Sequence, residues 1–305
     1  MDTIAKTLLE QIADLHEVPQ GAYNIRQNGE MAGRNTTENI DIVTKTDKPG
    51  IDIIIKAGTK NESVHIPVIL SKTGHTEMVY NDFYVGEGAD VTIVAGCGIH
   101  NAGDEESRHD GVHAFHLAAG ARLRYVEKHY GSGDGNGKRV MNPTTVIELA
   151  EDAYMEMEST QIKGVTSTIR ETEATLAAGA TLIVREKIMT HGQQLAETNF
   201  KVDLNGEGAS AQLMSRSVAK GESRQVFRSQ INGNAPCTAH SECDAIIMDS
   251  ASVSAIPEVT ANHLDAALIH EAAIGKIAGE QLIKLMTLGL TEQEAEEQIV
   301  NGFLK

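Results

Sequence analysis

The chain has 305 residues, enough for one large domain or two of ordinary size. Its net charge is −17, from 43 acidic and 26 basic residues, which argues against binding to nucleic acid or to an anionic membrane surface. Three cysteines, an odd number, do not make a disulfide framework, and no window approaches the run of about 18 to 20 apolar residues that a membrane span needs.

The first predicted element is a short amphipathic helix. Ile4, Leu8 and Ile12 recur at helical spacing, and Pro19 ends the pattern. The opening sequence has no apolar core flanked by basic residues, so we expect no signal peptide and a cytoplasmic protein with reduced thiols. We assign residues 1–37 to an N-terminal helical segment.

Residues 38–274 have strand character almost throughout. Segments such as IDIVTKTD and VHIPVILSK alternate or run apolar between turn residues, and no helix of three turns is expected. A repeated unit, in which a turn residue and an Ala precede an alternating strand, begins at five positions 27 to 32 residues apart: Gly88, Gly120, Asp152, Gly179 and Gly208. Repeats of this period without an internal helix indicate stacked β-coils, with Gly or Asp at the corners and Ala packed beneath them. We therefore predict a parallel β-helix in preference to the alternative, a β-sandwich of hairpins.

The C-terminal segment, residues 275–305, is predicted to be helical. Gly289 divides it into two helices, and Thr291 with Glu294 forms a capping box at the start of the second. From the residues alone, these helices are equally compatible with caps on an open β-helix and with a docking surface for a partner.

The richest cluster of candidate ligands is the run GCGIHNAGDEESRHDGVHAFH, which contains Cys97, His100, His109, His113 and His116. Imidazole and thiolate are the usual ligands of zinc and iron. The intervals match no zinc-finger spacing. A polar strand face and a metal role for at least one of these residues both stay open.

Cys243 opens the strand-like run CDAIIMD and presents two alternatives, a buried small hydrophobe or a thiolate ligand. Cys237, beside a Pro in a turn-like stretch, is interpreted as incidental. His270 and Glu271 lie in the apolar run ALIHEAAIG, where a buried charge needs a partner or a metal. Because neighbouring strand residues face opposite ways, only one of these two can face the core.

The sequence has no Gly-rich phosphate loop, no G-x-S-x-G elbow and no HExxH motif, which argues against an ATPase, a serine hydrolase and a zincin. A carbohydrate-acting β-helix is an alternative class. It would need basic partners for its carboxylates and exposed aromatic platforms, and the chain has six Tyr, five Phe and no Trp.

The C-terminal third resembles the SufB/SufD family of iron–sulfur cluster assembly proteins. The resemblance rests on ECDAIIMD, IPEV and IHEAAIGKIAGEQLIKLMTLGLTEQEAEEQIVNGF, in that order. It weakens toward residue 40 but includes Gly96–Cys97 and His109. It implies a right-handed parallel β-helix flanked by helices, in agreement with the repeat. It also implies that an ABC-type ATPase, SufC, docks on the C-terminal helices, which favours docking over capping.

Carried over residue by residue, the resemblance implies roles for five positions. Cys243 falls at the principal cluster-assembly cysteine of SufB-type scaffolds, and Cys97 at a second family cysteine on an inner path for sulfur. His270 and Glu271 match a His-Glu pair near the dimer interface. We expect Cys243, His270 and Glu271 to hold a transient iron–sulfur cluster, with Cys97 handling sulfur and His109 as a further metal ligand near it.

Two departures from the family pattern shape the functional prediction. Ile269 precedes the His-Glu pair where typical SufB chains have another Glu, and the cysteine-rich motif near the start of some SufB proteins is absent. The chain keeps the cysteine that SufD-type partners usually lack. We therefore expect a non-enzymatic scaffold subunit of a reduced system, which pairs with itself as a homodimer and takes sulfur from a donor protein. The alternative is a regulatory paralogue that binds the ATPase but builds no cluster.

Overall fold

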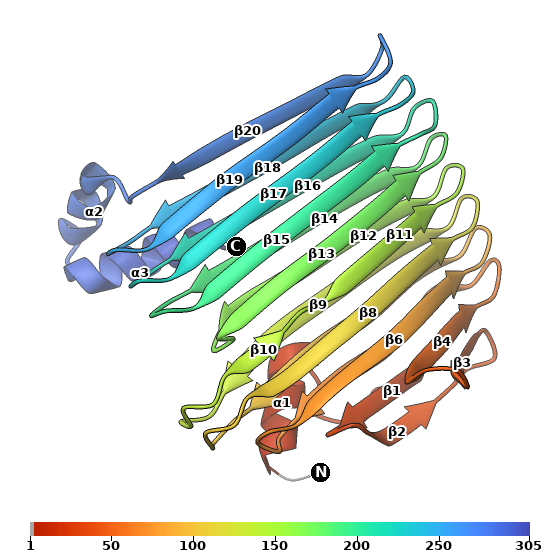
Figure 1. Ribbon diagram of the computed structural model, residues 1–305, viewed down its shortest axis with the longest axis horizontal. Helices are drawn as coiled ribbons and strands as arrows, with labels where there is room; N and C mark the ends of the chain where they lie inside the picture. The colour runs from red at the N-terminus through yellow and green to blue at the C-terminus, as the bar shows by residue number, and fades with distance from the viewer. Residues whose placement is uncertain (1–2) are drawn as a thin grey trace.

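The alternating segments of the chain form two long sheets that enclose one narrow interior (Figure 1). The computed structural model describes residues 3–305. Along this range the elements are α1 (Thr3–Ala13), β1 (Ala22–Gln27), β2 (Glu30–Asn35), β3 (Ile40–Thr44), β4 (Gly50–Ile55), β5 (Lys60–Leu70), β6 (Thr76–Val85), β7 (Asp90–His100), β8 (Ser107–Leu117), β9 (Arg122–Ser132), β10 (Arg139–Met141), β11 (Thr144–Leu149), β12 (Tyr154–Lys163), β13 (Ser167–Leu176), β14 (Thr181–Thr190), β15 (Leu195–Leu204), β16 (Ser210–Ala219), β17 (Arg224–Gly233), β18 (Thr238–Ile247), β19 (Ser252–Ala261), β20 (Ala267–Gly275), α2 (Gly279–Met286) and α3 (Glu292–Phe303).

From β4 onward, successive strands alternate between the two sheets, except that β10 and β11 both lie in sheet B. Within residues 3–305, sheet A has the order β2-β1-β5-β7-β9-β12-β14-β16-β18-β20, and sheet B the order β19-β17-β15-β13-β10-β8-β6-β4-β3, with β11 between β8 and β13. In this part of the chain, β1 and β2 pair antiparallel, as do β3 and β4, and the other neighbours pair parallel. The predicted parallel β-helix is confirmed.

The repeated unit forms a corner in five successive coils. Its turn residues have φ angles of 59, 61, 56, 65 and 75°, at Gly88, Gly120, Asp152, Gly179 and Gly208. Gly adopts this left-handed conformation without steric cost, and Asp tolerates it better than most residues. The Ala after each turn residue is fully buried, at positions Ala89, Ala121, Ala153, Ala180 and Ala209. The predicted corner and its small packed residue are therefore confirmed.

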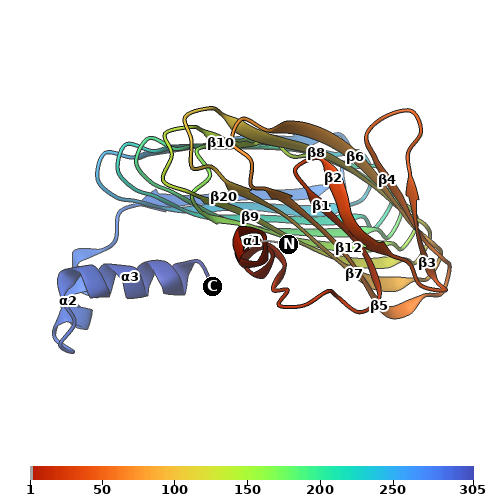
Figure 2. The ribbon, with the colours of Figure 1, turned by 90° about the horizontal axis from the view of Figure 1, so that it is seen from below.

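The helices lie on the outer face of sheet A, as Figure 2 shows for α1 and α3. Within residues 3–37, α1 is the helical part of the predicted N-terminal segment, and β1 and β2 already belong to sheet A. Residues 1 and 2 of that segment lie outside the described part. The capping box at Thr291 and Glu294 is confirmed at the start of α3. Val300 and Leu304 pack on Val218 of β16, whereas α2 has no buried residue.

The interior is apolar along much of its length but not throughout. Phe83 and Phe115 stack with ring centroids 4.5 Å apart, and Tyr125 packs edge-on against Phe115. Among the buried side chains are also charged ones, including Glu127, Arg170 and Glu186. Buried charges are costly unless they are paired, so the region that holds these side chains is a candidate functional site.

Candidate functional site

Cys243 lies inside the β-helix near its C-terminal end. It is 1% exposed on β18 and sits in register between Ser215 of β16 and Ala272 of β20. Burial, with smaller contributions from Glu186 and Asp244, raises the pKa of Cys243 to about 12. The thiol is therefore neutral at physiological pH as long as this end of the coil stays closed.

His270 shares the inner face with Cys243, whereas Glu271 does not. His270 pairs with Ser241, two residues before Cys243, so the alternation of the strand places both side chains inward. Burial, and then the nearby His240, lowers the pKa of His270. The imidazole is therefore neutral at physiological pH and has the protonation state of a metal ligand.

Glu271 belongs to a polar group on the outer face of sheet A. It pairs with Glu242, its side chain is 68% exposed, and one of its oxygens lies 3.9 Å from Nε2 of His240. A hydrogen bond with Asp244, together with burial, raises the pKa of Glu242. In one chain the Cys243–His270 pair and the Glu271 group therefore lie on opposite faces of the same two strands.

Cys97 and His109 lie together at the other end of the interior. Cys97 of β7 and His109 of β8 line a cavity of about 20 Å³, which also touches His113, Glu127 and His129. This volume has room for about one water molecule. Burial, then the charges of Glu77 and Glu127, raises the pKa of Cys97 well above its usual value.

His109 is tied to a buried carboxylate. Its Nδ1 lies 3.2 Å from Oε1 of Glu77, and a second oxygen of Glu77 lies 3.6 Å from both His75 and Arg26. Burial opposes ionisation of Glu77, but His109 and Arg26 outweigh it and lower its pKa. His109 is therefore part of a charge network at the N-terminal end of the interior.

The two cysteines cannot share one cluster within a single chain. Five inter-strand steps separate β7 from β18 in sheet A. At about 4.8 Å for each step, Cys97 and Cys243 lie roughly 24 Å apart. The predicted site residues therefore fall into an N-terminal pair, Cys97 with His109, and a C-terminal pair, Cys243 with His270.

The register connects these pairs through two neighbouring rows on the inner face of sheet A. The Cys243 row consists of Ala95, Glu127, Ser159, Glu186, Ser215 and Cys243. The Cys97 row consists of Cys97, His129, Gln161, Ile188, Ser217 and Ala245. Four of the six residues in the Cys243 row and three of the six in the Cys97 row are polar, so a polar line runs through the interior from one cysteine toward the other.

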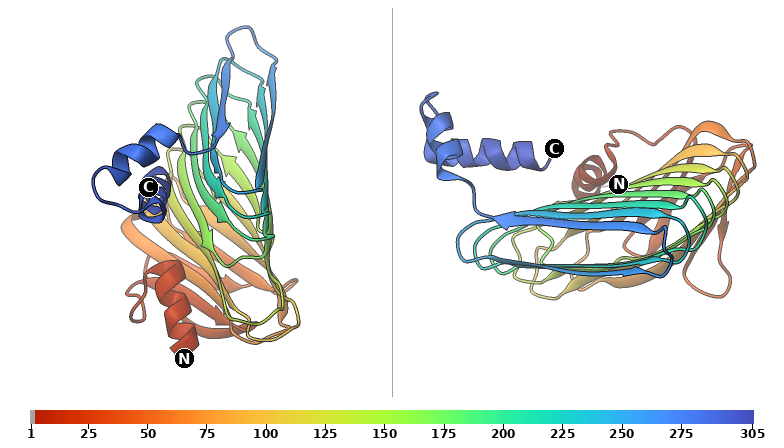
Figure 3. Two further views of the ribbon diagram at one scale, coloured as in Figure 1. Left: turned by 90° about the vertical axis from the view of Figure 1, so that its left-hand side faces the viewer. Right: turned by 90° about the horizontal axis from the view of Figure 1, so that it is seen from above.

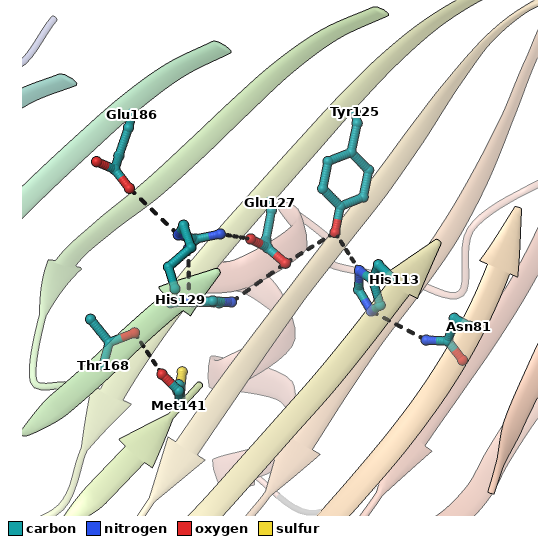
Figure 4. Close-up of polar contacts among 9 residues, drawn as sticks. Asn81, His113, Tyr125, Glu127, His129, Met141, Thr168 and Glu186 are labelled. Atoms are coloured by element: carbon teal, nitrogen blue, oxygen red, sulfur yellow. Dashed lines mark hydrogen bonds and ion pairs between the residues drawn. The ribbon is translucent and has the colours of Figure 1, made fainter. Parts of the chain in front are cut away.

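Arg170 of β13 reaches this line from the opposite sheet and lies between Glu127 and Glu186, two of the residues labelled in Figure 4. Its Nη1 donates to Oε2 of Glu127 at 2.7 Å, and its Nε lies 3.5 Å from Oε1 of Glu186. Ser215 donates to the other oxygen of Glu186 at 2.9 Å. One guanidinium thus bridges two carboxylates of the Cys243 row.

The two carboxylates differ in their ionisation. Burial opposes ionisation of Glu127, but His129 and Arg170 outweigh it and hold the pKa of Glu127 well below its usual value. Burial raises the pKa of Glu186, and Arg170 and Ser215 offset this only in part. The interior therefore holds one firmly ionised carboxylate and one that takes up a proton more readily.

Sequence reasoning did not single out Arg170, Glu127 or Glu186. Arg170 and Glu186 each stand alone among uncharged inward-facing neighbours of their own strands, whereas Glu127 has His129 two residues on. Glu127 and Arg170 are 43 residues apart. The only local signal is a charged residue at an inward position of an alternating strand. The partner of such a charged residue can be identified once the register of the coils is known.

The C-terminal end of the β-helix is open. In the described chain, β19 and β20 are the last strands of their sheets, and α2 and α3 lie beside sheet A rather than over this end (Figure 3). Ile256, Ile269 and Ile274 on these strands are 48, 55 and 37% exposed. Exposed apolar edge strands are templates for pairing with another chain.

Within residues 3–305, no group of three or more His, Cys, Asp or Glu side chains is placed to hold a metal ion. No helix in the same range is long and apolar enough to cross a membrane.

Comparison with known proteins identifies the family. The model of the SUF system FeS cluster assembly SufBD core domain matches residues 69–303. The chain belongs to the SufBD family. Relatives in this family include SufBD proteins described as iron–sulfur cluster assembly family members in Methanocaldococcus jannaschii and Archaeoglobus fulgidus.

Three of the SufBD relatives that match most of this chain are 28 to 30% identical to it. The match to the Methanocaldococcus jannaschii protein is 28% identical and covers 83% of this chain and 79% of the relative. The match to the Archaeoglobus fulgidus protein is 30% identical and covers 79% and 65%, respectively. A relative from Methanothermobacter thermautotrophicus is 29% identical, and the chain spans only 55% of its length.

Proposed function

We propose that this SufBD chain is the scaffold on which a transient iron–sulfur cluster is built, in the cytoplasm and together with a SufC-type ABC ATPase. Cys243 is the principal ligand, His270 and Glu271 complete the site, and the cluster is cargo that passes to other proteins. The observation that carries the proposal is the position of Cys243. It faces the interior beside His270, one strand from the open edge formed by β20.

The raised pKa of Cys243 supports a mechanism in which opening creates the ligand. A buried neutral thiol binds iron poorly, because the thiolate is the ligand form. Movement of β20 away from β18 would hydrate Cys243, and its pKa, about 12 in the closed state, would fall toward the usual value. Opening would also let Glu271, from the outer face, approach the thiolate.

The helix α2 supports docking of an ATPase. Ile283, Met286 and the following Leu288 are 62, 43 and 76% exposed. An amphipathic helix with no buried residue presents its apolar face to a partner. ATP binding by that partner would supply the work of opening.

The open edge supports a homodimer. Pairing of two copies along β19 or β20 would cover the exposed Ile256 and Ile269 and bring two Cys243 sites toward one interface. Light scattering at micromolar concentration tests this. A dimer that becomes monomeric in Ile269→Lys supports it, and a wild-type monomer refutes it.

Cys97 is proposed to accept sulfur from a donor protein, and the two polar rows are proposed to lead it toward Cys243. The Arg170 guanidinium, which faces both rows, supports passage of an anionic sulfur species.

Iron and acid-labile sulfide per chain test the scaffold proposal, after anaerobic co-expression with a SufC-type ATPase. Wild type, Cys243→Ala and Cys97→Ala are compared. Cys237→Ala is the matched control, because Cys237 is also buried but takes the place of the corner Ala in its coil. Loss of iron and sulfide in Cys243→Ala, with retention in Cys237→Ala, supports the proposal. A colourless wild type refutes it and favours a regulatory paralogue.

A further inference from the structure

Cys97 is 2% exposed, so a sulfur donor needs an opening in the structure to reach its thiol. Its side chain points into the interior from β7. The outer face of β7 at this position is covered by α1, which packs there through Leu8 and Ile12. The helix and the thiol therefore lie on opposite sides of a single strand.

Two glycines let α1 approach this strand closely. A Cβ atom at Gly98 would lie 3.1 Å from Cβ of Leu8, and one at Gly96 would lie 3.0 Å from Cβ of Ile12. Both glycines flank Cys97 directly. With no side chains of its own on this face, the strand around Cys97 is shielded from solvent by α1.

The sheet is weak at the same place. Pro67 of β5 lies opposite Gly96 and has no backbone N–H to donate to a neighbouring strand. On its other side, β1 pairs with β5 at residues 64–65 and 68–69 but not at 66–67. Glycines within a strand further lower its local stability. The pairing of β5 with β7 is continuous from Glu62 to Leu70, so an opening beside Cys97 rests on the local weakness that Pro67, Gly96 and Gly98 bring to this seam.

Among the contacts of the described residues, apolar packing and an ion pair at the surface hold the helix to the sheet. Ala5, Leu8 and Leu9 form a cluster with Ile25 and Ile69, which is separate from the main core. The ion pair joins Asp14, next to the end of α1, to Lys128 of β9 at 2.5 Å. Detachment of α1 would leave the two-sheet interior intact.

We propose that α1 is a removable cover over the β5–β7 seam and that a persulfide-carrying donor reaches Cys97 through this seam when α1 detaches. The transfer of sulfur to Cys97 rests on the proposed function, whereas the role of α1 as a cover does not. The transfer needs no external oxidant, since donor–S–SH and Cys97–SH give donor–SH and Cys97–S–SH.

Thiol labelling of the full chain tests the proposal. A pulse of N-ethylmaleimide, followed by digestion and mass spectrometry, gives a separate rate for Cys97, Cys237 and Cys243. Leu8→Glu places a charge on the buried face of α1, and Ile4→Glu is the matched control, because Ile4 is 39% exposed on the same helix. Labelling of Cys97 is expected to become about tenfold faster in Leu8→Glu, the signature of local opening, and to stay unchanged in Ile4→Glu.

Gly98→Val tests the same step from the strand side. The valine side chain would collide with Leu8 and push α1 away from the sheet. Because valine is β-branched, it favours the extended conformation of β7 itself. Faster labelling of Cys97 alone in both Leu8→Glu and Gly98→Val supports the proposal.

Two results overturn it. One is slow labelling of Cys97 although hydrogen exchange shows that residues 3–13 have detached. The other is equal acceleration at Cys97 and Cys243, which reports global unfolding. Because labelling requires no cluster, a chain that binds no iron but exposes Cys97 in this way retains the cover and loses only the scaffold function.

Discussion

Replacement of Arg170 by Met is the sharpest test of the buried polar line. Arg170 is 3% exposed, and its 2.7 Å hydrogen bond to Glu127 joins two fully buried charges. Met has a similar length and no charge, so the variant leaves Glu127 without its guanidinium. Breaking a buried pair in this way costs about 3–5 kcal/mol.

The local contacts place the expected loss at the lower end of that range, about 3 kcal/mol at pH 7. His129 stays 3.6 Å from Glu127 and compensates in part. Glu186, at 3.5 Å from Arg170, already has a raised pKa and takes up a proton when the guanidinium is removed. The free energy of unfolding in urea, measured from midpoint and slope, gives the loss.

The pH dependence has a definite sign. The folded-state pKa of Glu127 lies well below its usual 4.5, so its pairing stabilises the wild type above about pH 4.5 and this contribution fades as the pH falls through the lowered pKa. The variant lacks most of this contribution. The stability difference between wild type and Arg170→Met is therefore expected to shrink as the pH falls below 4.5.

Two further variants decide the interpretation. The double variant Arg170→Met/Glu127→Gln removes both charges and is expected to regain more than half of the loss. Arg228→Met is the control, since Arg228 pairs with Glu197 at the surface with its side chain 43% exposed, and it is expected to cost under about 1 kcal/mol. A loss below about 1 kcal/mol in Arg170→Met, or no recovery in the double variant, would refute the reasoning.

Three other outcomes follow from the fold. Thr291→Ala removes the capping box of α3 and is expected to cost about 1 kcal/mol, seen as faster hydrogen exchange in α3; unchanged exchange would contradict this. Ala180→Leu overfills a corner at 0% exposure and is expected to lower unfolding stability by about 1–3 kcal/mol, and a neutral effect would mean that the corner is loosely packed. Burial lowers the pKa of His113 from 6.5 to about 4, so the folded chain binds fewer protons and loses stability as the pH falls from 6.5 to 4. His113→Gln is expected to flatten this slope in urea titrations, and an unaltered slope would assign it to other groups.

The fold was readable from the sequence because its determinants are local. A turn residue with positive φ, such as Gly120 or Asp152, and a small buried residue after it recur at five corners. The strand that follows alternates between core and surface. These features lie within about ten residues, so one chain suffices to recognise them.

The site was readable only in part, because its determinants are not local. Alternation within one strand predicts that His270 and Glu271 face opposite ways, and the structure has them so. No local pattern reports that Arg170 meets Glu127 and Glu186 from the other sheet. That contact depends on which coil lies above which, and hence on the exact number of residues in each turn.

The last coil of the β-helix, formed by β19 and β20, is open on one side. An inner coil is held by neighbours on both sides, whereas β19 and β20 each have a neighbour on one side only. In a stack with nearest-neighbour contacts, thermal fraying starts at the end strands, and β19 and β20 are the end strands beside Cys243. Cys243 lies a single strand from it, and the release of one strand bares the thiol without disturbing the remaining coils. The coil geometry thus places Cys243 one strand away from a terminus of the stack that can fray.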